Sequence, residues 1–161
     1  MVNSKIDGTA PFFIIAGILA ALDQLAKYLI VKTIPLNTRM AIIPGLLNLV
    51  DVRNKGGAFS IFARPGHPWR QYVFMGLTIV VVAAIAYAYG KIGKRDNWTR
   101  IAYICIAGGA MGNLVDRIRL REVIDFIDVY VGSWHWPAFN VADSAISTGA
   151  VMLLVSLIRS K

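Results

Sequence analysis

Two carboxylates lie in apolar stretches of the chain, where an ionised group is costly. Asp125 stands within the run Val123–Ile127, and Asp143 stands near the start of a hydrophobic stretch that continues to Ile158. A carboxylate near lipid needs either a partner or a chemical role. One interpretation is that each pairs with an arginine and holds helices together. The other is a shared site, because two carboxylates can perform acid–base hydrolysis without a metal ion, a cysteine or a histidine.

The elements that must position these residues are membrane spans. Of the 161 residues, 57% are apolar, and the mean hydropathy is +0.58. Four segments are candidate spans, at about residues 11–31, 71–90, 101–117 and 139–158. The third reaches the ~20 residues that a span needs only if its polar end stays helical and faces protein. The sequence predicts one integral-membrane domain, residues 1–161, built as an all-α bundle of four transmembrane helices with a small extracytoplasmic β unit.

The basic residues indicate how the bundle is oriented. In a soluble protein the formal net charge of +8 would suggest nucleic acid as a partner. Here the basic residues flank the spans, so we expect membrane lipids with anionic headgroups instead. The short connection between the second and third spans is densely basic, and Lys5 and Arg159 lie near the two chain ends. The longer opposite loops are basic at lower density, which predicts that both termini are cytoplasmic.

The β unit is expected between the first two spans, at about residues 38–62. Residues 46–53 have the composition of a strand, and a second short apolar run follows at 58–62. Between them, residues 54–57 contain two glycines, which allow the positive φ that tight turns require. We therefore expect a small β unit with a tight turn on the extracytoplasmic side.

Polar residues also recur within the spans. Asp23 and Lys27 are four residues apart in the first span, which places them on one helical face as a structural ion pair. Asn113 and Arg117 end the third span, and helix packing by small residues does not explain them. Asn140 and its neighbours fall on one side of the fourth span. The polar faces of the third and fourth spans can therefore meet.

The connection between the third and fourth spans contains two aspartates, either of which could face the bundle. Residues 123–131 are compatible with an extended strand, which sends Asp125 and Asp128 to opposite faces. Only one of them can point at the bundle. The polar cluster is then expected near the extracytoplasmic boundary of the membrane.

In this order and topology, several motifs closely resemble those of the bacterial lipoprotein signal peptidases (signal peptidase II). The motifs are Asn54–Phe59, Gly112–Arg117, Val123–Phe126 and Phe139–Asp143, with Asp23, Gln24 and Lys27 in the first span. The resemblance covers nearly the whole chain. One departure is Gly57, where alanine is the more usual residue.

This resemblance implies an intramembrane aspartyl endopeptidase. Such an enzyme removes signal peptides from prolipoproteins, cleaving before a cysteine that already carries diacylglycerol. The family's catalytic aspartates correspond to Asp125 and Asp143, which favours Asp125 over Asp128 as the strand residue that faces the bundle. Further characteristic positions, expected to bind or orient substrate, are Asn54, Gly56, Asn113, Arg117, Asn140 and Ala142. The resemblance also implies inhibition by globomycin, no cofactor, no metal and a location in the bacterial cytoplasmic (inner) membrane.

Two other function classes were compared with this one. A small four-span transporter could use intramembrane carboxylates as its coupling site, but such sites lie near the bilayer midplane rather than at one face. A metalloprotease of the zincin type needs a His-Glu-x-x-His motif, which the sequence lacks.

Overall fold

Four long helices form the body of the protein in a computed structural model that describes residues 9–56, 69–92 and 96–159. They are α1 (Ala10–Thr33), α2 (Trp69–Tyr89), α3 (Asn97–Leu120) and α4 (Val141–Arg159). All four are long and apolar enough to cross a membrane. The third helix is longer than the expected 101–117 segment, because it continues through its polar end to Leu120. The fourth begins at Val141 rather than at residue 139.

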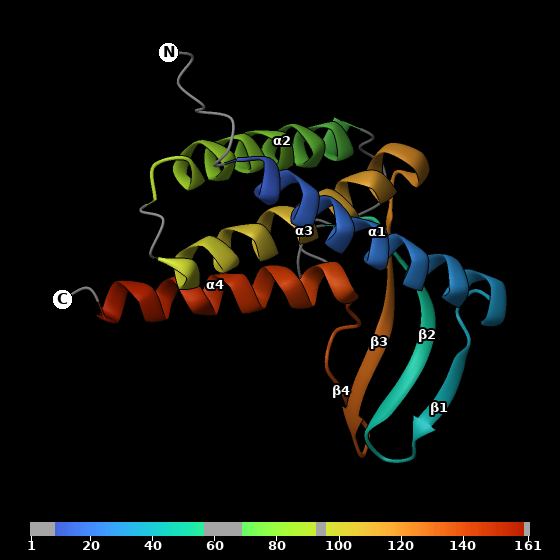
Figure 1. Cartoon of the computed structure of the whole chain (residues 1–161). Coiled ribbons are helices and arrows are strands. Elements are labelled where there is room, and N and C mark those ends of the chain that lie inside the picture. Colours follow the sequence, from blue (N-terminus) through green and yellow to red (C-terminus); the bar gives the residue numbers. More distant parts are fainter. Residues whose placement is uncertain (1–8, 57–68, 93–95, 160–161) are drawn as a thin grey trace, which may run out of the picture.

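Helix α3 is the centre of the bundle and contacts each of the other three helices (Figure 1). Its small residues allow this. A Cβ atom on Gly108 would lie 2.9 Å from the carbonyl oxygen of Ala16 in α1. A Cβ atom on Gly109 would overlap the carbonyl of Ala142 in α4. The glycines therefore let two neighbouring backbones approach α3 more closely than larger residues would permit.

A sheet extends from one end of the bundle (Figure 1). Its strands are β1 (Arg39–Ile43), β2 (Leu47–Asn54), β3 (Val123–Val131) and β4 (Trp134–His135), paired antiparallel in that order. A small cluster of Ile30 from α1, Ile34 just after α1 and Phe126 from β3 joins the sheet to the bundle. We call this the sheet end of the bundle.

The structure describes part of the expected β unit. Strand β2 pairs with β1 on one side and with β3 on the other. One tight turn lies between β1 and β2, where Gly45 has φ +83°. The second apolar run, residues 58–62, lies outside the described residues, so the turn expected at residues 54–57 stays a prediction.

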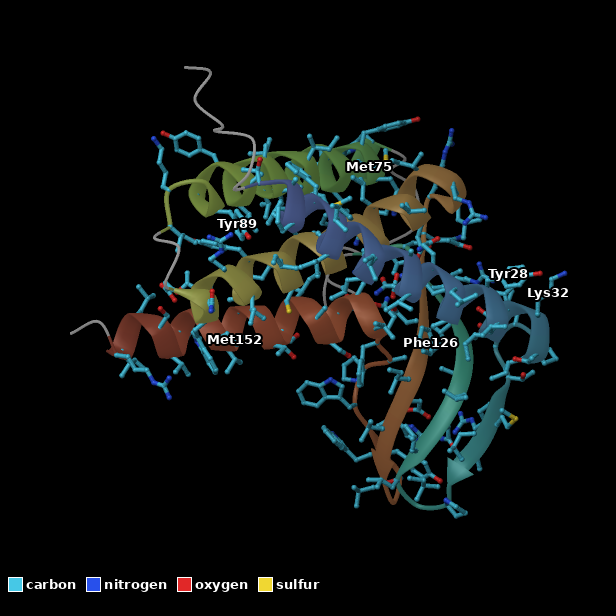
Figure 2. All side chains as sticks on the ribbon, in the orientation of Figure 1. Tyr28, Lys32, Met75, Tyr89, Phe126 and Met152 are labelled. Atoms are coloured by element: carbon cyan, nitrogen blue, oxygen red, sulfur yellow. The ribbon has the colours of Figure 1, made fainter. Side chains whose placement is uncertain are left out.

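The outer surface of the helices is apolar. Large hydrophobic side chains are exposed along α1, α2 and α4, including Ile14, Val80 and Leu154. Figure 2 shows Tyr28 and Lys32 toward the sheet end and Tyr89 and Met152 toward the other end, with side chains radiating from every helix. An exposed apolar surface of this extent is what a bilayer covers.

Candidate active site

The fourth helix begins with a reciprocal cap that contains one of the two aspartates. Asn140 immediately precedes α4, and its Oδ1 accepts a hydrogen bond from the backbone N–H of Asp143 at 2.8 Å. In return, Asp143 Oδ2 accepts from the backbone N–H of Asn140 at 3.3 Å. This is the geometry of a capping box, which satisfies two free donors at a helix start. The spacing Asn-x-x-Asp therefore fixes the position of Asp143.

Strand β3 delivers the other aspartate. Asp125 is 3% exposed, and its two oxygens accept from two amides. Asn140 Nδ2 donates to Oδ1 at 2.8 Å, and Asn54 Nδ2 donates to Oδ2 at 3.0 Å. Asn54 ends strand β2, which runs beside β3 with Val52 opposite Asp125. Two strands and the cap of α4 thus converge on one carboxylate.

Asp128, three residues further along β3, does not join this group. Its carboxylate accepts from Asn48 Nδ2 at 2.8 Å and pairs with His135 Nδ1 at 2.7 Å within the sheet. Of the two strand aspartates, Asp125 is the one that faces the bundle, as the alternation of side chains along a strand requires.

Helix α3 supplies the third amide. Asn113 Nδ2 donates to Asp143 Oδ1 at 2.8 Å. The same amide accepts on Oδ1 from Lys27 Nζ at 3.1 Å and from Asn140 Nδ2 at 3.2 Å. Asn113 is 6% exposed and Asn140 is fully buried, so these hydrogen bonds form where water does not compete.

The three amides share one orientation. Each has its oxygen occupied by a donor: Lys27 Nζ for Asn113, the Asp143 N–H for Asn140, and the Gly56 N–H for Asn54, at 2.9 Å. An ammonium group and a backbone N–H can only donate. Each amide therefore turns its NH₂ group toward Asp125 or Asp143. Gly56, a candidate substrate contact in the sequence, lies here as the residue that orients Asn54.

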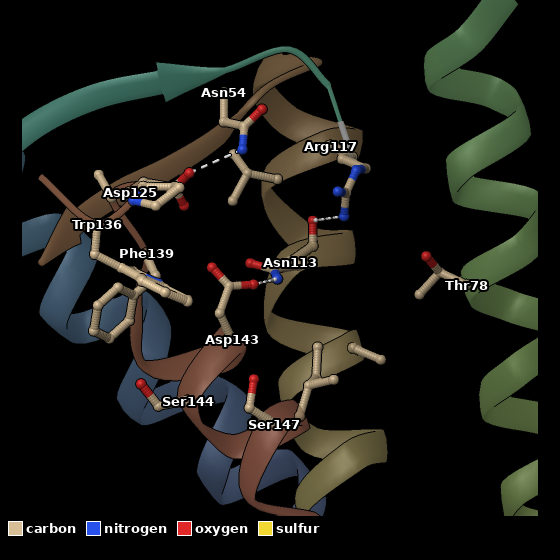
Figure 3. Close-up of a pocket in the computed structure, with 15 residues that line it drawn as sticks. Asn54, Thr78, Asn113, Arg117, Asp125, Trp136, Phe139, Asp143, Ser144 and Ser147 are labelled. Atoms are coloured by element: carbon tan, nitrogen blue, oxygen red, sulfur yellow. Dashed lines mark hydrogen bonds between the residues drawn. The ribbon is translucent and has the colours of Figure 1, made fainter. Parts of the chain in front are cut away.

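The two aspartates line a common pocket of about 510 Å³. Figure 3 shows Asp125 and Asp143 facing into it, with Asn54 and Asn113 beside them and Thr78 across from them on α2. The remaining lining residues come from α3, α4, β3 and the segment before α4: Ala110, Arg117, Val123, Trp136, Pro137, Ala138, Phe139, Ser144, Ile146 and Ser147. The pocket is thus polar around the aspartates, and Ala110 of α3 and Ile146 of α4 add an apolar part to its wall.

The setting of Asp125 changes its proton affinity. Burial raises the pKa of Asp125 from the ordinary value of 3.8 to about 7. The hydrogen bond from Asn54 opposes this rise, and the negative charge of Asp143 adds to it. A carboxyl group with a pKa near neutrality can both hold and release a proton at physiological pH.

The comparisons with known proteins agree with this geometry. The family profile described as "Signal peptidase (SPase) II" matches residues 15–159. The lipoprotein signal peptidase of Geobacter metallireducens is 41% identical over 150 residues, which cover 93% of this chain and 91% of that protein. The chain belongs to the signal peptidase II family. The lipoprotein signal peptidase of Nitratidesulfovibrio vulgaris is 42% identical over 145 residues, covering 90% of this chain and 87% of the relative.

Solved structures support the same assignment. A bacterial membrane enzyme determined by the in meso method at 2.3 Å resolution superposes with a TM-score of 0.82 and 30% identity. The match covers 92% of this chain and 88% of that one. As a signal peptidase II, the chain is a protease and a multi-pass bacterial membrane protein. Nothing supports the transporter alternative.

Two further candidate residues of this signal peptidase II lie at the edge of the cluster. Arg117 lines the pocket, with Nη1 3.4 Å from the carbonyl oxygen of Asn113 and its guanidinium 5.7 Å above the ring of Phe74. It makes no ion pair with Asp116 in the described part of the chain. Ala142 is fully buried, and its backbone N–H donates to Asp23 Oδ1 at 2.9 Å.

Residues beyond the predicted site also contribute to the polar cluster. Asp116 pairs with Lys27 at 2.7 Å and accepts from the backbone N–H of Ile124 at 3.3 Å. Gln24 Nε2 donates to Asp116 at 2.8 Å. The signal that could have found them is helical spacing, because Asp116 and Asn113 are three residues apart on the face of α3 that receives Lys27.

Proposed function

We propose that the chain is an aspartyl endopeptidase that removes signal peptides from prolipoproteins, with Asp125 and Asp143 as its catalytic pair. The observation that carries this proposal is the convergence of two carboxylates, from β3 and α4, on one pocket at the sheet end of the bundle. The relatives named above are lipoprotein signal peptidases. A prolipoprotein is accordingly the substrate class we assign.

The chemistry requires one proton shared by the pair. We assign the ionised state to Asp143, because it lies in the first turn of α4, where the helix dipole stabilises negative charge. We assign the proton to Asp125, whose raised pKa favours the neutral form at neutral pH. These assignments describe the resting state of the pair.

The reaction then proceeds in two proton-transfer steps. Asp143 takes a proton from a water molecule as the water oxygen attacks the scissile carbonyl carbon, and Asp125 donates its proton to the carbonyl oxygen. In the second step the carbon–nitrogen bond breaks. Asp143 gives its proton to the leaving amine, and Asp125 recovers a proton from the tetrahedral diol. The products are a peptide carboxylic acid and a free amine, and the pair returns to its starting state.

The amides have a supporting role in this scheme. Asn54, Asn113 and Asn140 each direct their NH₂ group at a catalytic carboxylate. Arg117 has an Nε that is buried without a hydrogen bond among the described residues, so it is the group we assign to substrate carbonyl oxygens. Gly56 and Ala142 act through the Asn54 amide and through the start of α4.

The lipid on the substrate should contribute strongly to recognition. The pocket continues from the aspartates along apolar residues of α3 and α4, including Ala110 and Ile146. Acyl chains lying there would gain about 0.8 kcal/mol for each buried methylene. We therefore infer that the substrate cysteine carries diacylglycerol and that globomycin competes for the same pocket.

The direct test is cleavage by purified protein in detergent. A precursor whose cysteine carries diacylglycerol should be cut before that cysteine, and the same precursor with an unmodified cysteine should be a poor substrate. Globomycin should inhibit the cleavage, and a chelator should leave it unchanged because the scheme uses no metal. Equal turnover of the two precursors would contradict the lipid requirement. If neither precursor is cleaved, the proposed function is wrong.

We also propose that the sheet end faces the extracytoplasmic side and that both termini are cytoplasmic. The opposite end of the bundle carries Lys91, Arg100 and Arg159 on or beside the helix ends, as expected for a cytoplasmic face. A membrane-impermeant thiol reagent added to spheroplasts should label a Ser133→Cys variant and spare an Asn97→Cys variant, since both positions are exposed. The reverse labelling pattern would invert the orientation.

A further inference from the structure

A buried ammonium group lies behind the two aspartates. Lys27, on α1, is 1% exposed. Its Nζ lies 2.7 Å from Asp23 Oδ2, 2.7 Å from Asp116 Oδ2 and 3.1 Å from Asn113 Oδ1. An ammonium group has three N–H donors, and three groups surround this one: an amide oxygen that accepts a hydrogen bond and two carboxylates that form ion pairs with it. A surface ion pair would not need this degree of satisfaction.

Each of these three acceptors makes a second contact that leads to the catalytic pair. Asp23 accepts from the backbone N–H of Ala142, the residue immediately before Asp143. Asp116 accepts from the backbone N–H of Ile124, the residue immediately before Asp125.

The third acceptor reaches a carboxylate directly. Asn113 donates through Nδ2 to Asp143 Oδ1. Lys27 is therefore connected to both reacting residues through three contacts, which we call its arms. Two arms, through Asp23 and Asp116, end on the backbone N–H groups of Ala142 and Ile124. The third, through Asn113, ends on the Asp143 carboxylate.

We propose that Lys27 is a positioning residue of the proteolytic reaction, which holds Asp125 and Asp143 at their working separation through Asp23, Asp116 and Asn113. This inference rests on the proposed function and extends the description of Asp23 and Lys27 as a structural pair. Lys27 itself does not line the pocket, so it touches neither substrate nor water in the reaction. A displacement of about 1 Å at a catalytic group can cost about 100-fold in rate.

Packing around the arms explains why they have little freedom. A Cβ atom on Gly112 would lie 2.7 Å from Asp23 Oδ2, so the Asp23 carboxylate is held against the backbone of α3. Lys27, Asp23 and Asp116 are each exposed by 1% or less. Without the ammonium group, two buried carboxylates would lose their counter-charge, and the oxygen of the Asn113 amide would keep only the hydrogen bond from Asn140 Nδ2.

The test compares Lys27→Met with Lys32→Met, a control on the same helix whose lysine is exposed. Both are purified in detergent, and only the monodisperse fraction is assayed on a diacylglyceryl precursor. Lys27→Met should lower kcat about 100-fold and leave KM within about 3-fold, since the substrate-lining residues are unchanged. Lys32→Met should match the wild type.

The pH profile separates positioning from simple loss of fold. The charged groups that face the pair are Asp23, Lys27, Asp116 and Arg117, and only Lys27 is changed. The positive charge of Lys27 lowers the pKa of Asp125, so in Lys27→Met the basic limb of the kcat profile should move to higher pH. A structural role alone would reduce the yield of monodisperse protein while the survivors kept the wild-type kcat and profile, and that result would overturn the inference.

A second variant tests the inference if Lys27→Met folds poorly. The cluster of Lys27, Asp23 and Asp116 carries a net charge of −1, and the double variant Lys27→Met/Asp116→Asn carries the same charge on Asp23 alone. Its Asn113 arm is still broken, so kcat should remain more than about tenfold below wild type. Wild-type kcat and pH profile in the double variant would contradict the inference. If instead the wild type fails to cleave, or Asp125→Asn retains activity, the proposed function itself fails.

Discussion

Asn140 and Asp143 cap each other: the Asn140 Oδ1 accepts from the Asp143 N–H, and the Asp143 Oδ2 accepts from the Asn140 N–H. The same Asn140 side chain donates to Asp125 through Nδ2. One residue therefore begins the helix that carries one of the proposed catalytic aspartates, Asp143, and binds the other, Asp125. Helix initiation and the spacing of the pair are determined by the same local contacts.

Replacement of Asn140 should separate these two roles. Serine caps a helix about as well as asparagine but cannot donate to Asp125 in the same way, whereas alanine does neither. Asn140→Ser should keep the helix cap and lose about tenfold or more in kcat, because Asp125 becomes charged when it gives up its proton and a hydrogen bond to a charged group contributes about 1.5–3 kcal/mol. Asn140→Ala should lose the same activity and be about 1 kcal/mol less stable than Asn140→Ser, because it also lacks the cap. Equal activity of Asn140→Ser and wild type would show that the amide donor is dispensable.

The raised pKa of Asp125 predicts how activity depends on pH. Because the neutral form donates a proton to the scissile carbonyl, kcat should fall as pH rises through about 7. Measurement of kcat from pH 5 to pH 9 checks this, and a rate that stays constant across pH 7 would argue against Asp125 as the proton donor.

The raised pKa of Asp125 also predicts how the stability of the folded state depends on pH. The folded value of about 7 exceeds the ordinary 3.8, so the folded state binds the proton more tightly than the unfolded state. This contribution to stability is fully present below pH 3.8 and is lost as pH rises through 7. The melting temperature of the wild type should fall between about pH 4.5 and pH 7.5, and that of Asp125→Asn should fall less. Parallel curves would mean that Asp125 does not titrate in this range.

Replacement of Asn54 should shift the pH at which kcat declines on the alkaline side, the basic limb of the pH profile. Its hydrogen bond lowers the pKa of Asp125, so Asn54→Ala should allow that pKa to rise further, and the decline in kcat should begin at higher pH than in wild type. Asn48→Ala is a suitable control, because Asn48 donates to Asp128 elsewhere in the sheet. A basic limb that moves to lower pH, or does not move, would contradict the assigned direction of this hydrogen bond.

The close approach of α3 and α4 should be sensitive to a single methyl group. A Cβ atom on Gly109 would overlap the Ala142 carbonyl, which precedes Asp143, whereas a Cβ atom on Gly76 in α2 meets nothing within 4 Å. Gly109→Ala should cost about 1–3 kcal/mol and lower kcat, while Gly76→Ala should be neutral. Thermal denaturation and cleavage rates of the two variants decide this, and equal behaviour would mean that α4 can shift without consequence.

The four spans were predictable because hydrophobic runs of this length have few alternatives, and Asp125 and Asp143 were identifiable because charge in such runs is costly. The partner of β2 was not predictable from local signals. Its pairing with β3 brings together residues about seventy positions apart, such as Asn54 and Asp125, and no turn residue specifies that contact. The direction in which each amide points was also inaccessible, because it depends on donors from other elements, such as Lys27.

The most direct measurement is the rate at which Asp125→Asn, Asp143→Asn and Asp128→Asn cleave a diacylglyceryl precursor in detergent. An amide cannot exchange the proton that each step requires, so the first two variants should fold and show no cleavage. Asp128→Asn should retain substantial activity, because Asp128 bonds to Asn48 and His135 in the sheet. Cleavage at a near wild-type rate by either Asp125→Asn or Asp143→Asn would contradict the aspartyl mechanism.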